Sequence, residues 1–455
     1  MDVFLELPFE LSRLLIIDWC KVRDLLALDT AYCNNAKREP WEKVLRSADH
    51  FCSHKLPAKM TLAACENWIF ARRIPIKKLE WNAYTKFAPC SGYLKDLGDS
   101  IEEVTIKYKS DEREVQTILS RLEMHCNHIV KLTCSCCVLD PVLINLLQKS
   151  SLKHLKIYDI WGTETEFSDD VSCEGSHHLQ LHSLDLFCVK SHWFIPLLLK
   201  LLDPCTIQQF CLYWTSCVPQ DLLKAFFSLC CNLRALGLNS YHYFGDEELL
   251  SLVQPCQSLL HLDISYCDNL TDDIAEALFH SVTQLSTLSI SGTKLTDAFL
   301  EALAIHCSDS LQALYASHCS NIQEEGVIAV LTSCAQLRTL ECMSDCLDNN
   351  ENLDGLTTLI VWDVDTDAPV WADGHCAKLK HLRLVFHETS VDDFDFTQIT
   401  VQVLPRLHTL AVNLYLNEDD DVEPASLQEL RSARPNLRVC FNTDVLAYDL
   451  MKLPM

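Results

Sequence analysis

The sequence predicts an α/β solenoid, in which a curved parallel sheet lines the inside and helices cover the outside. The first observation is the pattern Leu-x-x-Leu-x-Leu, with Ile, Phe or Ala substitutes, whose first residue recurs every 26 residues at Leu181, Ile207, Leu233, Leu259, Leu285, Leu311 and Leu337. The second is an apolar helical stripe between successive patterns. A globular core has no reason to keep a fixed interval, whereas each solenoid coil places its apolar residues on the same side as the coil before it.

One coil, starting at Leu259, shows both elements. In the run 259–264, residues 259, 262 and 264 point inward, and their alternation with polar residues predicts a strand. The segment Thr271–Asp273 offers an N-cap for a helix. That helix carries an i, i+3, i+4 stripe of Ile274, Ala277 and Leu278. A strand on the concave side followed by a helix on the convex side is the layout of a leucine-rich repeat.

The same pattern continues outside the regular block at intervals of 19 to 30 residues. Its first residues are Ile76, Ile101, Ile129 and Leu152 upstream, and Leu356, Leu379, Leu407 and a degenerate Leu437 downstream. These anchors predict about fifteen coils in a solenoid over residues 73–445. Residues 46–72 are expected to form a helical linker or cap, and residues 446–455 a C-terminal tail.

Eight of the 25 cysteines follow the register of the repeat at two recurring offsets. Three lie eight residues after an anchor, and five lie three residues before the next one: Cys137, Cys267 and Cys319, and Cys126, Cys230, Cys256, Cys334 and Cys376. Two recurring offsets predict a ladder of core thiols. The first residues lack the basic and long apolar regions of a signal peptide, so we expect reduced thiols and a cytoplasmic or nuclear location. A secreted disulfide scaffold is the less favoured alternative.

Composition and motifs argue against several classes of function. The net charge of −26 disfavours nucleic acid and anionic membrane as partners, since both need a basic face. The most apolar stretch, residues 193–202, is far too short to span a bilayer. No phosphate-binding loop, dinucleotide fingerprint or zinc-protease motif occurs. Two segments come nearest to metal-ligand spacing. His50–His54 lacks a paired motif nearby, and Cys134–Cys137 runs through the strand and turn of a repeat, with Cys134 and Cys137 at core positions. We therefore expect neither enzymatic activity, nor a cofactor, nor a metal.

Residues 1–45 predict a small all-helical module. Pro8 lies in the first turn of a helix, where its missing N–H costs little, and Leu11, Leu14 and Leu15 continue an apolar stripe. A second helix carries Leu25, and Trp41 belongs to a third short segment. Helices this small cannot bury a core alone, so their apolar faces need a partner chain or the adjoining solenoid.

Two segments resemble known families. The run 259–273 is similar to the cysteine-containing subclass of leucine-rich repeats, with a strong match over 181–345 and a looser one outside. That subclass is found chiefly in F-box proteins, and the N-terminal module resembles an F-box in its opening, middle and closing aromatic. The sequence departs from the F-box pattern at 28–34, where basic residues and a tryptophan are usual.

The F-box resemblance implies docking on the small adaptor subunit of a cullin–RING ubiquitin ligase. The docking residues would be Leu7, Pro8, Glu10, Leu11, Leu14, Leu25 and Trp41. The alternative is that residues 1–45 only close the first coil of the solenoid, because solenoids need capped ends.

The concave face is the predicted binding surface. Side chains between and after the inward residues of each strand project from it, and the candidates for substrate binding are Tyr158, Phe187, Tyr213, Asn239, Asp263, Tyr315 and Trp362. Three of the aromatic residues fall in successive coils, as binding anchors would. Alternatively, the rings pack on one another and only shield the sheet.

Together these features predict a substrate-recognition subunit of a cullin–RING (SCF-type) ubiquitin ligase. Its partners would be the ligase adaptor subunit, the cullin complex and an unknown protein substrate. An acidic scaffold or stoichiometric inhibitor of a basic protein is the alternative, supported by 21 acidic against 8 basic residues from Glu341 onward. Regulation of a small GTPase is a third possibility by architectural analogy alone.

Overall fold

A computed structural model describes residues 77–82, 94–95, 98–107, 112–135, 141–149, 151–158, 179–189, 194–214, 218–240, 244–347, 353–364, 376–387, 391, 394–415 and 424–441. The chain divides into two compact units, Met1–Ile207 and Gln208–Met455. The predicted N-terminal module, the linker, all seven adaptor-docking residues, Cys137 and the C-terminal tail lie outside the described residues.

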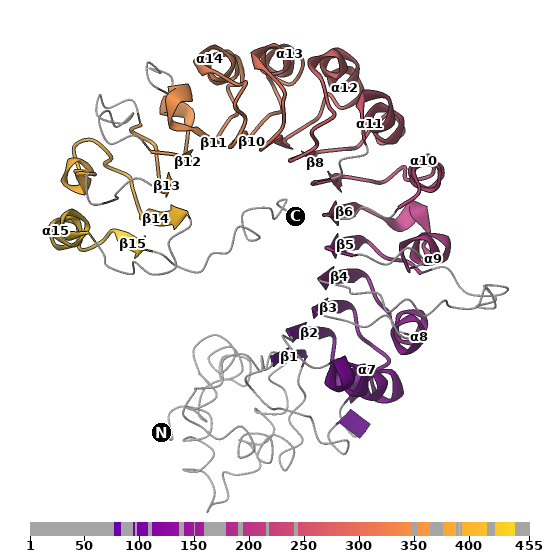
Figure 1. Cartoon of the computed structure of the whole chain (residues 1–455). Helices are drawn as coiled ribbons and strands as arrows, with labels where there is room; N and C mark the ends of the chain where they lie inside the picture. The colour runs from indigo at the N-terminus through magenta and orange to yellow at the C-terminus, as the bar shows by residue number, and fades with distance from the viewer. Residues whose placement is uncertain are drawn as a thin grey trace, which may run out of the picture. The chain divides into compact units, whose positions relative to one another are not determined.

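The first unit contains five parallel strands in chain order: β1 Lys78–Asn82, β2 Glu103–Lys107, β3 Lys131–Ser135, β4 His154–Tyr158 and β5 Ser183–Phe187. Its helices are η2 Gly98–Ser100, α7 Glu112–His125, α8 Pro141–Lys149, α9 Phe194–Leu201 and η3 Pro204–Thr206. Helices α7, α8 and α9 lie on one side of these strands (Figure 1). The interior between the two layers is apolar, because inward strand residues such as Leu155 and Leu184 meet the buried stripe of each helix.

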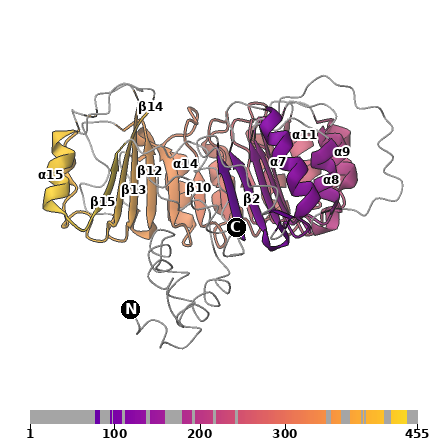
Figure 2. The same cartoon turned by 90° about the horizontal axis from the view of Figure 1, so that it is seen from below.

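The second unit contains ten parallel strands: β6 Gln209–Tyr213, β7 Ala235–Gly237, β8 His261–Asp263, β9 Thr287–Ser289, β10 Ala313–Tyr315, β11 Thr339–Met343, β12 Thr358–Trp362, β13 His381–His387, β14 Thr409–Tyr415 and β15 Arg438–Phe441. In Figure 2, its strands from β10 to β15 run side by side.

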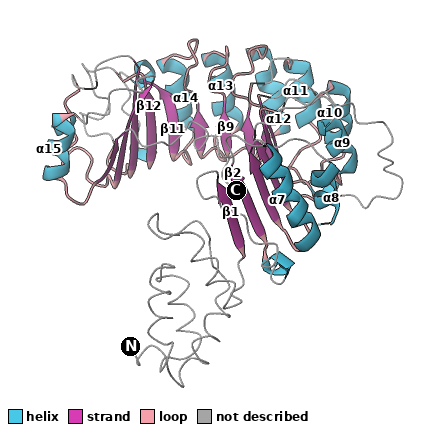
Figure 3. Ribbon diagram, turned by 60° about the horizontal axis from the view of Figure 1, so that its bottom comes forward, coloured by secondary structure: helices cyan, strands magenta, loops and turns pink. Residues whose placement is uncertain are grey.

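Helices of the second unit also cover one side of its strands (Figure 3). They are α10 Gln220–Phe227, α11 Asp246–Val253, η4 Asp272–Ile274, α12 Ala275–Ser281, α13 Asp297–His306, α14 Glu324–Ser333, η5 Ser344–Leu347, η6 Leu353–Gly355, η8 Phe396–Gln398 and α15 Ala425–Ala433. No described helix has both the length and the apolar character needed to cross a membrane.

The predicted leucine-rich-repeat solenoid fold is confirmed. A strand begins two residues after each anchor from Ile76 to Leu407, and one residue after the degenerate Leu437. The coil from Leu337 to Leu356 departs from the strand-and-helix layout. Its 19 residues leave no room for an α-helix, so the short 3₁₀ turns η5 and η6 take its place.

A left-handed residue turns the chain away from the sheet after many strands. It lies seven residues after the anchor, at Cys188, Trp214, Ser240, Tyr266, Gly292, His318 and Asp363, with φ between 52° and 69°. At Gly292 the conformation and the space both favour glycine, because a Cβ there would lie 2.4 Å from the ring of Tyr266. The sequence analysis did not predict this position, since glycine occupies it only once in this series.

The cysteine ladder consists of buried thiols that donate to backbone carbonyls. Cys267 Sγ lies 3.1 Å from the carbonyl oxygen of Leu238, and Cys319 Sγ lies 3.1 Å from that of Ile290, one coil earlier in each case. The cysteines before the anchors bond to the last carbonyls of a helix, as Cys256 Sγ does to Leu252 O at 3.4 Å. The prediction of core thiols is therefore confirmed at these positions.

One cysteine departs from the expected reduced state. Cys134, in β3, is disulfide-bonded, whereas the fifteen other cysteines in the described part of the chain are free.

The predicted helix N-cap at Thr271 works differently from the expectation. Thr271 precedes η4, but its side chain accepts no capping hydrogen bond. Instead, its backbone N–H and hydroxyl donate to the carboxylate of Asp246 in the preceding coil, at 2.9 and 2.5 Å. Thr296 repeats this arrangement with Asp272 at 2.9 and 2.6 Å. The threonine therefore links neighbouring coils.

Thiol alkylation is expected to distinguish the ladder from the surface. Burial raises the pKa of the thiols of Cys126, Cys256, Cys307 and Cys376 to about 12, and the thiolate is the reactive form. In the folded protein at pH 8, iodoacetamide should modify the exposed Cys205 and Cys231 first. Peptide mass spectrometry before and after denaturation measures this. Labelling of Cys256 as fast as Cys231 would contradict a buried ladder.

Candidate binding surface

The candidate site is the open face of the sheet, which we define as the face that no described helix covers. Its side chains come from the positions two, four and six residues after each anchor, because neighbouring strand residues point to opposite faces. All seven residues predicted to bind substrate lie at such positions.

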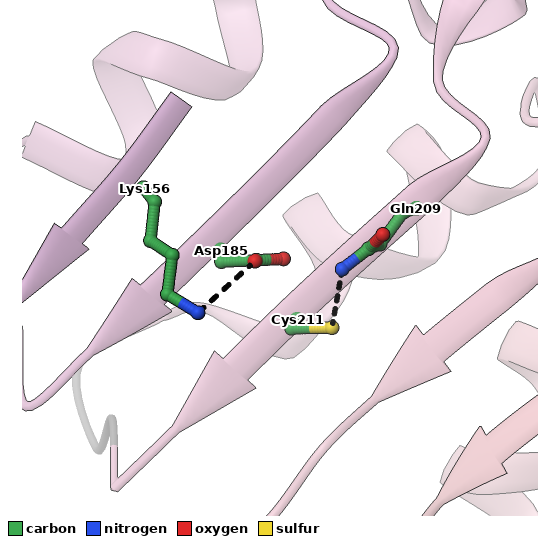
Figure 4. Close-up of polar contacts among 4 residues, drawn as sticks. All are labelled: Lys156, Asp185, Gln209 and Cys211. Carbon is green, nitrogen blue, oxygen red and sulfur yellow. Dashed lines mark hydrogen bonds and ion pairs between the residues drawn. The ribbon is translucent and has the colours of Figure 1, made fainter. Parts of the chain in front are cut away.

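In the first unit, the two candidates Tyr158 and Phe187 form a compact cluster with Lys156 and Asp185. The rings of Tyr158 and Phe187 stack with centroids 4.6 Å apart, and Lys156 Nζ lies 5.2 and 4.7 Å from those centroids. Lys156 also pairs with Asp185 at 3.7 Å (Figure 4). Phe187 is only 5% exposed, whereas Tyr158 is half-buried. A partner can therefore reach the ring of Tyr158 more easily than the ring of Phe187.

In the second unit, Tyr213 reaches across its neighbouring strand. A Cβ at Gly237 would lie 3.0 Å from the Tyr213 hydroxyl, so the absence of a side chain there gives the phenol its place. The hydroxyl is hydrogen-bonded to the carboxyl of Asp263, one strand further on. Beside this tyrosine, Gln209 Nε2 lies 3.9 Å from Cys211 Sγ (Figure 4). Tyr213 is 2% exposed, so it belongs to the buried base of the open face and not to its exposed surface.

Asp263 is the centre of a buried hydrogen-bond network. Its carboxylate accepts from the backbone N–H of Ser265 at 3.0 Å and also bonds to the side chains of Ser265 and Ser289. The two serine hydroxyls lie 2.7 Å from one another. Burial raises the pKa of Asp263, and these hydrogen bonds oppose the shift. Asn239 is also fully buried, with its side-chain oxygen accepting from Ser240 Oγ at 2.8 Å.

A second buried acid, Glu341, lies on the open face three strands away, in β11. Its Oε1 accepts from the indole N–H of Trp362 at 2.7 Å, and the Ser317 side chain forms another hydrogen bond. Burial raises the pKa of Glu341, while Arg383 favours its ionised form. The hydrogen bond from Trp362 to Glu341 fixes the orientation of the indole ring of this candidate anchor.

Apolar side chains surround Trp362 and form what we call the Trp362 cluster. Ile360, Trp362 and Val385 are buried against one another, and the half-buried Tyr315 and Met343 pack on them. The ring of His318 meets that of Trp362 edge-on, with centroids 4.5 Å apart. All five cluster members occupy outward positions, so this apolar group stands apart from the interior core.

The structure therefore groups the predicted residues into three sets. Tyr158 and Phe187 belong to the Lys156 cluster, Tyr213 bonds to Asp263, and Tyr315 packs with Trp362. Asn239 is buried beside Ser240 rather than presented to a partner. Four residues that are not among the predicted ones also belong to this surface, namely Glu341, Met343, Ile360 and Val385. The signal was available, because outward positions of three consecutive strands carry apolar residues there.

The described residues contain no group of three or more His, Cys, Asp or Glu side chains that could hold a metal ion. On the open face, the carboxyl groups of Asp263 and Glu341 bond to neighbouring side chains, whereas Nδ1 of His154, Nδ1 of His261 and Nε of Arg383 are buried without a hydrogen-bond partner in the described part of the chain. The buried thiols bond to backbone carbonyls. Hydrogen bonding, cation–π contact and apolar packing are therefore the interactions that this surface offers a partner.

No protein-family model matches the sequence. Solved structures that are similar to the chain include the following three. The crystal structure of the Rad7 and Elc1 complex in yeast matches at 16% identity over 92% of this chain and 98% of that chain, with a TM-score of 0.48. The leucine-rich-repeat protein LegL7 from Legionella pneumophila matches at 12% identity over 56% and 93%, with a TM-score of 0.39. An internalin from Listeria monocytogenes matches at 16% identity over 74% and 86%, with a TM-score of 0.40.

Proposed function

We propose that this chain is a protein-binding adaptor that serves as the substrate-recognition subunit of a cullin–RING ubiquitin ligase. The observation that carries the binding role is the Trp362 cluster on the open face. Its rings are held by a hydrogen bond and by mutual packing, so they lose little conformational freedom when a partner binds. Ligation chemistry would lie in the other subunits of the ligase, and this chain would need no cofactor.

The docking half of the proposal depends on the F-box-like residues 1–45. Their apolar stripe needs a partner because helices this short bury little surface by themselves. In the proposed assembly, Leu7, Pro8 and Leu11 contact the adaptor subunit, and the open face of the solenoid receives the substrate.

Co-purification tests the docking half. The full chain is recovered from a eukaryotic lysate alongside a variant with Leu7, Pro8 and Leu11 replaced by alanine, and a control with the exposed Ile305 of α13 replaced by alanine. Adaptor and cullin subunits should accompany the parent and the control but not the triple variant. If these subunits are missing from all three samples, residues 1–45 are a cap and the ligase role is wrong.

A second candidate is an acidic scaffold or inhibitor that grips a basic protein. The specific observation in its favour is the charge of the open face in β6–β12, whose outward positions contain Asp263 and Glu341 but neither lysine nor arginine. Rising ionic strength would weaken this binding between opposite charges, because salt screens charge pairs. Helix docking through Leu11 and Trp41 would instead persist in high salt, which separates the two candidates.

A further inference from the structure

We propose that the open face around Tyr315 and Glu341 binds a lysine or arginine side chain of a protein partner. The inference rests on the protein-binding half of the proposed function and is independent of adaptor docking. It assigns the chemistry of the partner, a cationic side chain on a polypeptide segment, and the residues of this chain that would receive it.

Charge complementarity identifies the occupant. Over the seven strands from β6 to β12, the outward side chains include two carboxylic acids and no lysine or arginine. The nearest guanidinium, Arg383 in β13, is separated from Glu341 in register by Ile360 of β12. Within the described part of the chain, Glu341 forms no ion pair, although Arg383 favours its ionised form. A cation brought by a partner would supply the close charge that this carboxylate lacks.

Glu341 has hydrogen-bonding capacity to spare. A carboxylate can accept about four hydrogen bonds, and the donors here are Trp362 Nε1 and the Ser317 side chain. The side chain is also desolvated, since the residue is 5% exposed, so its charge is weakly screened and its field extends to the neighbouring groups. A cation that contacts the cluster surface would therefore be stabilised by the carboxylate beneath it.

An aromatic side chain and several short ones complete the proposed binding site for the cation. Tyr315 is a half-buried member of the Trp362 cluster, and its pKa is raised first by burial and then by the charge of Glu341. A cation beside Tyr315 would be attracted by the ring quadrupole and by the charge of Glu341 together. Next to Tyr315, the outward positions of β9 and the outward position just after it carry the short side chains of Thr287, Ser289 and Ser291, which would let the backbone of a bound segment approach the sheet.

Binding of charge-matched peptides tests the assignment. The probes are a fluorescein-labelled peptide in which lysine alternates with glycine and serine, and the same peptide with glutamine in place of lysine. Fluorescence anisotropy with the purified full chain should show binding of the lysine peptide only. Equal binding of both peptides, or no binding of the lysine peptide, overturns the proposal. An acidic peptide that binds more tightly than the lysine peptide overturns it as well.

Two variants and a control locate the site. Glu341→Gln keeps the shape and an acceptor for Trp362, and should weaken lysine-peptide binding by about tenfold, the loss expected for one charged hydrogen bond. Glu301→Gln makes the same charge change on the exposed outer surface of α13 and should change affinity by less than about twofold. Tyr315→Leu should also weaken binding. Equal losses from Glu341→Gln and Glu301→Gln would reduce the effect to net charge and overturn the assignment.

The pH profile gives a second readout that a purely structural role of Glu341 would not produce. Because burial raises the pKa of Glu341, lysine-peptide affinity should fall as the pH is lowered through that raised value, and Glu341→Gln should lack this fall. The titratable and charged groups that interact with Glu341 are Asp263, Tyr315 and Arg383, together with the buried thiols of Cys319 and Cys342. A parallel profile in the parent and in Glu341→Gln would overturn the assignment, whatever the co-purification experiment shows about ligase subunits.

Discussion

Replacing Phe299 with alanine is expected to lower the free energy of unfolding by about 3–5 kcal/mol. Phe299 is fully buried in α13, and its ring centroid lies 5.1 Å from that of Phe279 in α12. The loss combines the apolar surface of the ring with the cavity that remains between the two coils. In a solenoid each coil contacts only its neighbours, so the destabilisation should centre on the coils around α13.

Hydrogen exchange along the full chain measures this prediction, together with the midpoint of chemical unfolding. Amides of β9, β10 and α12–α14 should lose protection before those of more distant strands. The matched control is Ile305→Ala on the same helix, because Ile305 is 73% exposed and its removal leaves no cavity. A change in Ile305→Ala as large as that in Phe299→Ala would contradict the assigned orientation of α13.

Helix α13 also shows how far the fold can be predicted from sequence. The repeat predicts a helix between Leu285 and Leu311, and the strands follow from the anchors throughout. An apolar residue such as Ile305 reads equally well as core, and only the packing of α13 against the sheet places it outside. Likewise, the 19-residue interval after Leu337 predicts a shorter coil but does not specify that η5 and η6 replace a helix.

The candidate site is less predictable, because it depends on contacts between coils. Strand alternation correctly places Tyr213, Asp263 and Trp362 on the open face, since that requires only the local period of two. Their burial is set by residues one or more repeats away, such as Gly237 beneath Tyr213 and Glu341 beside Trp362. A local sequence pattern does not encode contacts between residues in different repeats. The sequence therefore identifies which residues lie on the open face, but not which residues bury them.

Removing the carboxyl group of Asp263 is expected to have the largest effect of any open-face substitution. Asp263→Ala leaves the buried N–H of Ser265 and the hydroxyl of Tyr213 without their acceptor. An unsatisfied buried donor costs about 1–3 kcal/mol, so the free energy of unfolding should fall by about 2–4 kcal/mol. The near-isosteric Asp263→Asn keeps an acceptor and should lose less. Thermal unfolding of the full chain measures both variants against Asp273→Asn, an exposed acid of η4.

The pH dependence of Asp263→Asn provides the sharper test of this network. Burial raises the pKa of Asp263 in the folded protein above its unfolded value of about 3.9, so folding favours the protonated acid. The resulting stabilisation is fully present below the unfolded pKa and is lost as the pH rises through the folded one. Asparagine cannot ionise, so the stability of Asp263→Asn should improve relative to the parent as the pH rises across this window. If the difference between the two proteins stays constant with pH, the carboxyl group has the same pKa in the folded and unfolded states, and its burial does not govern the network.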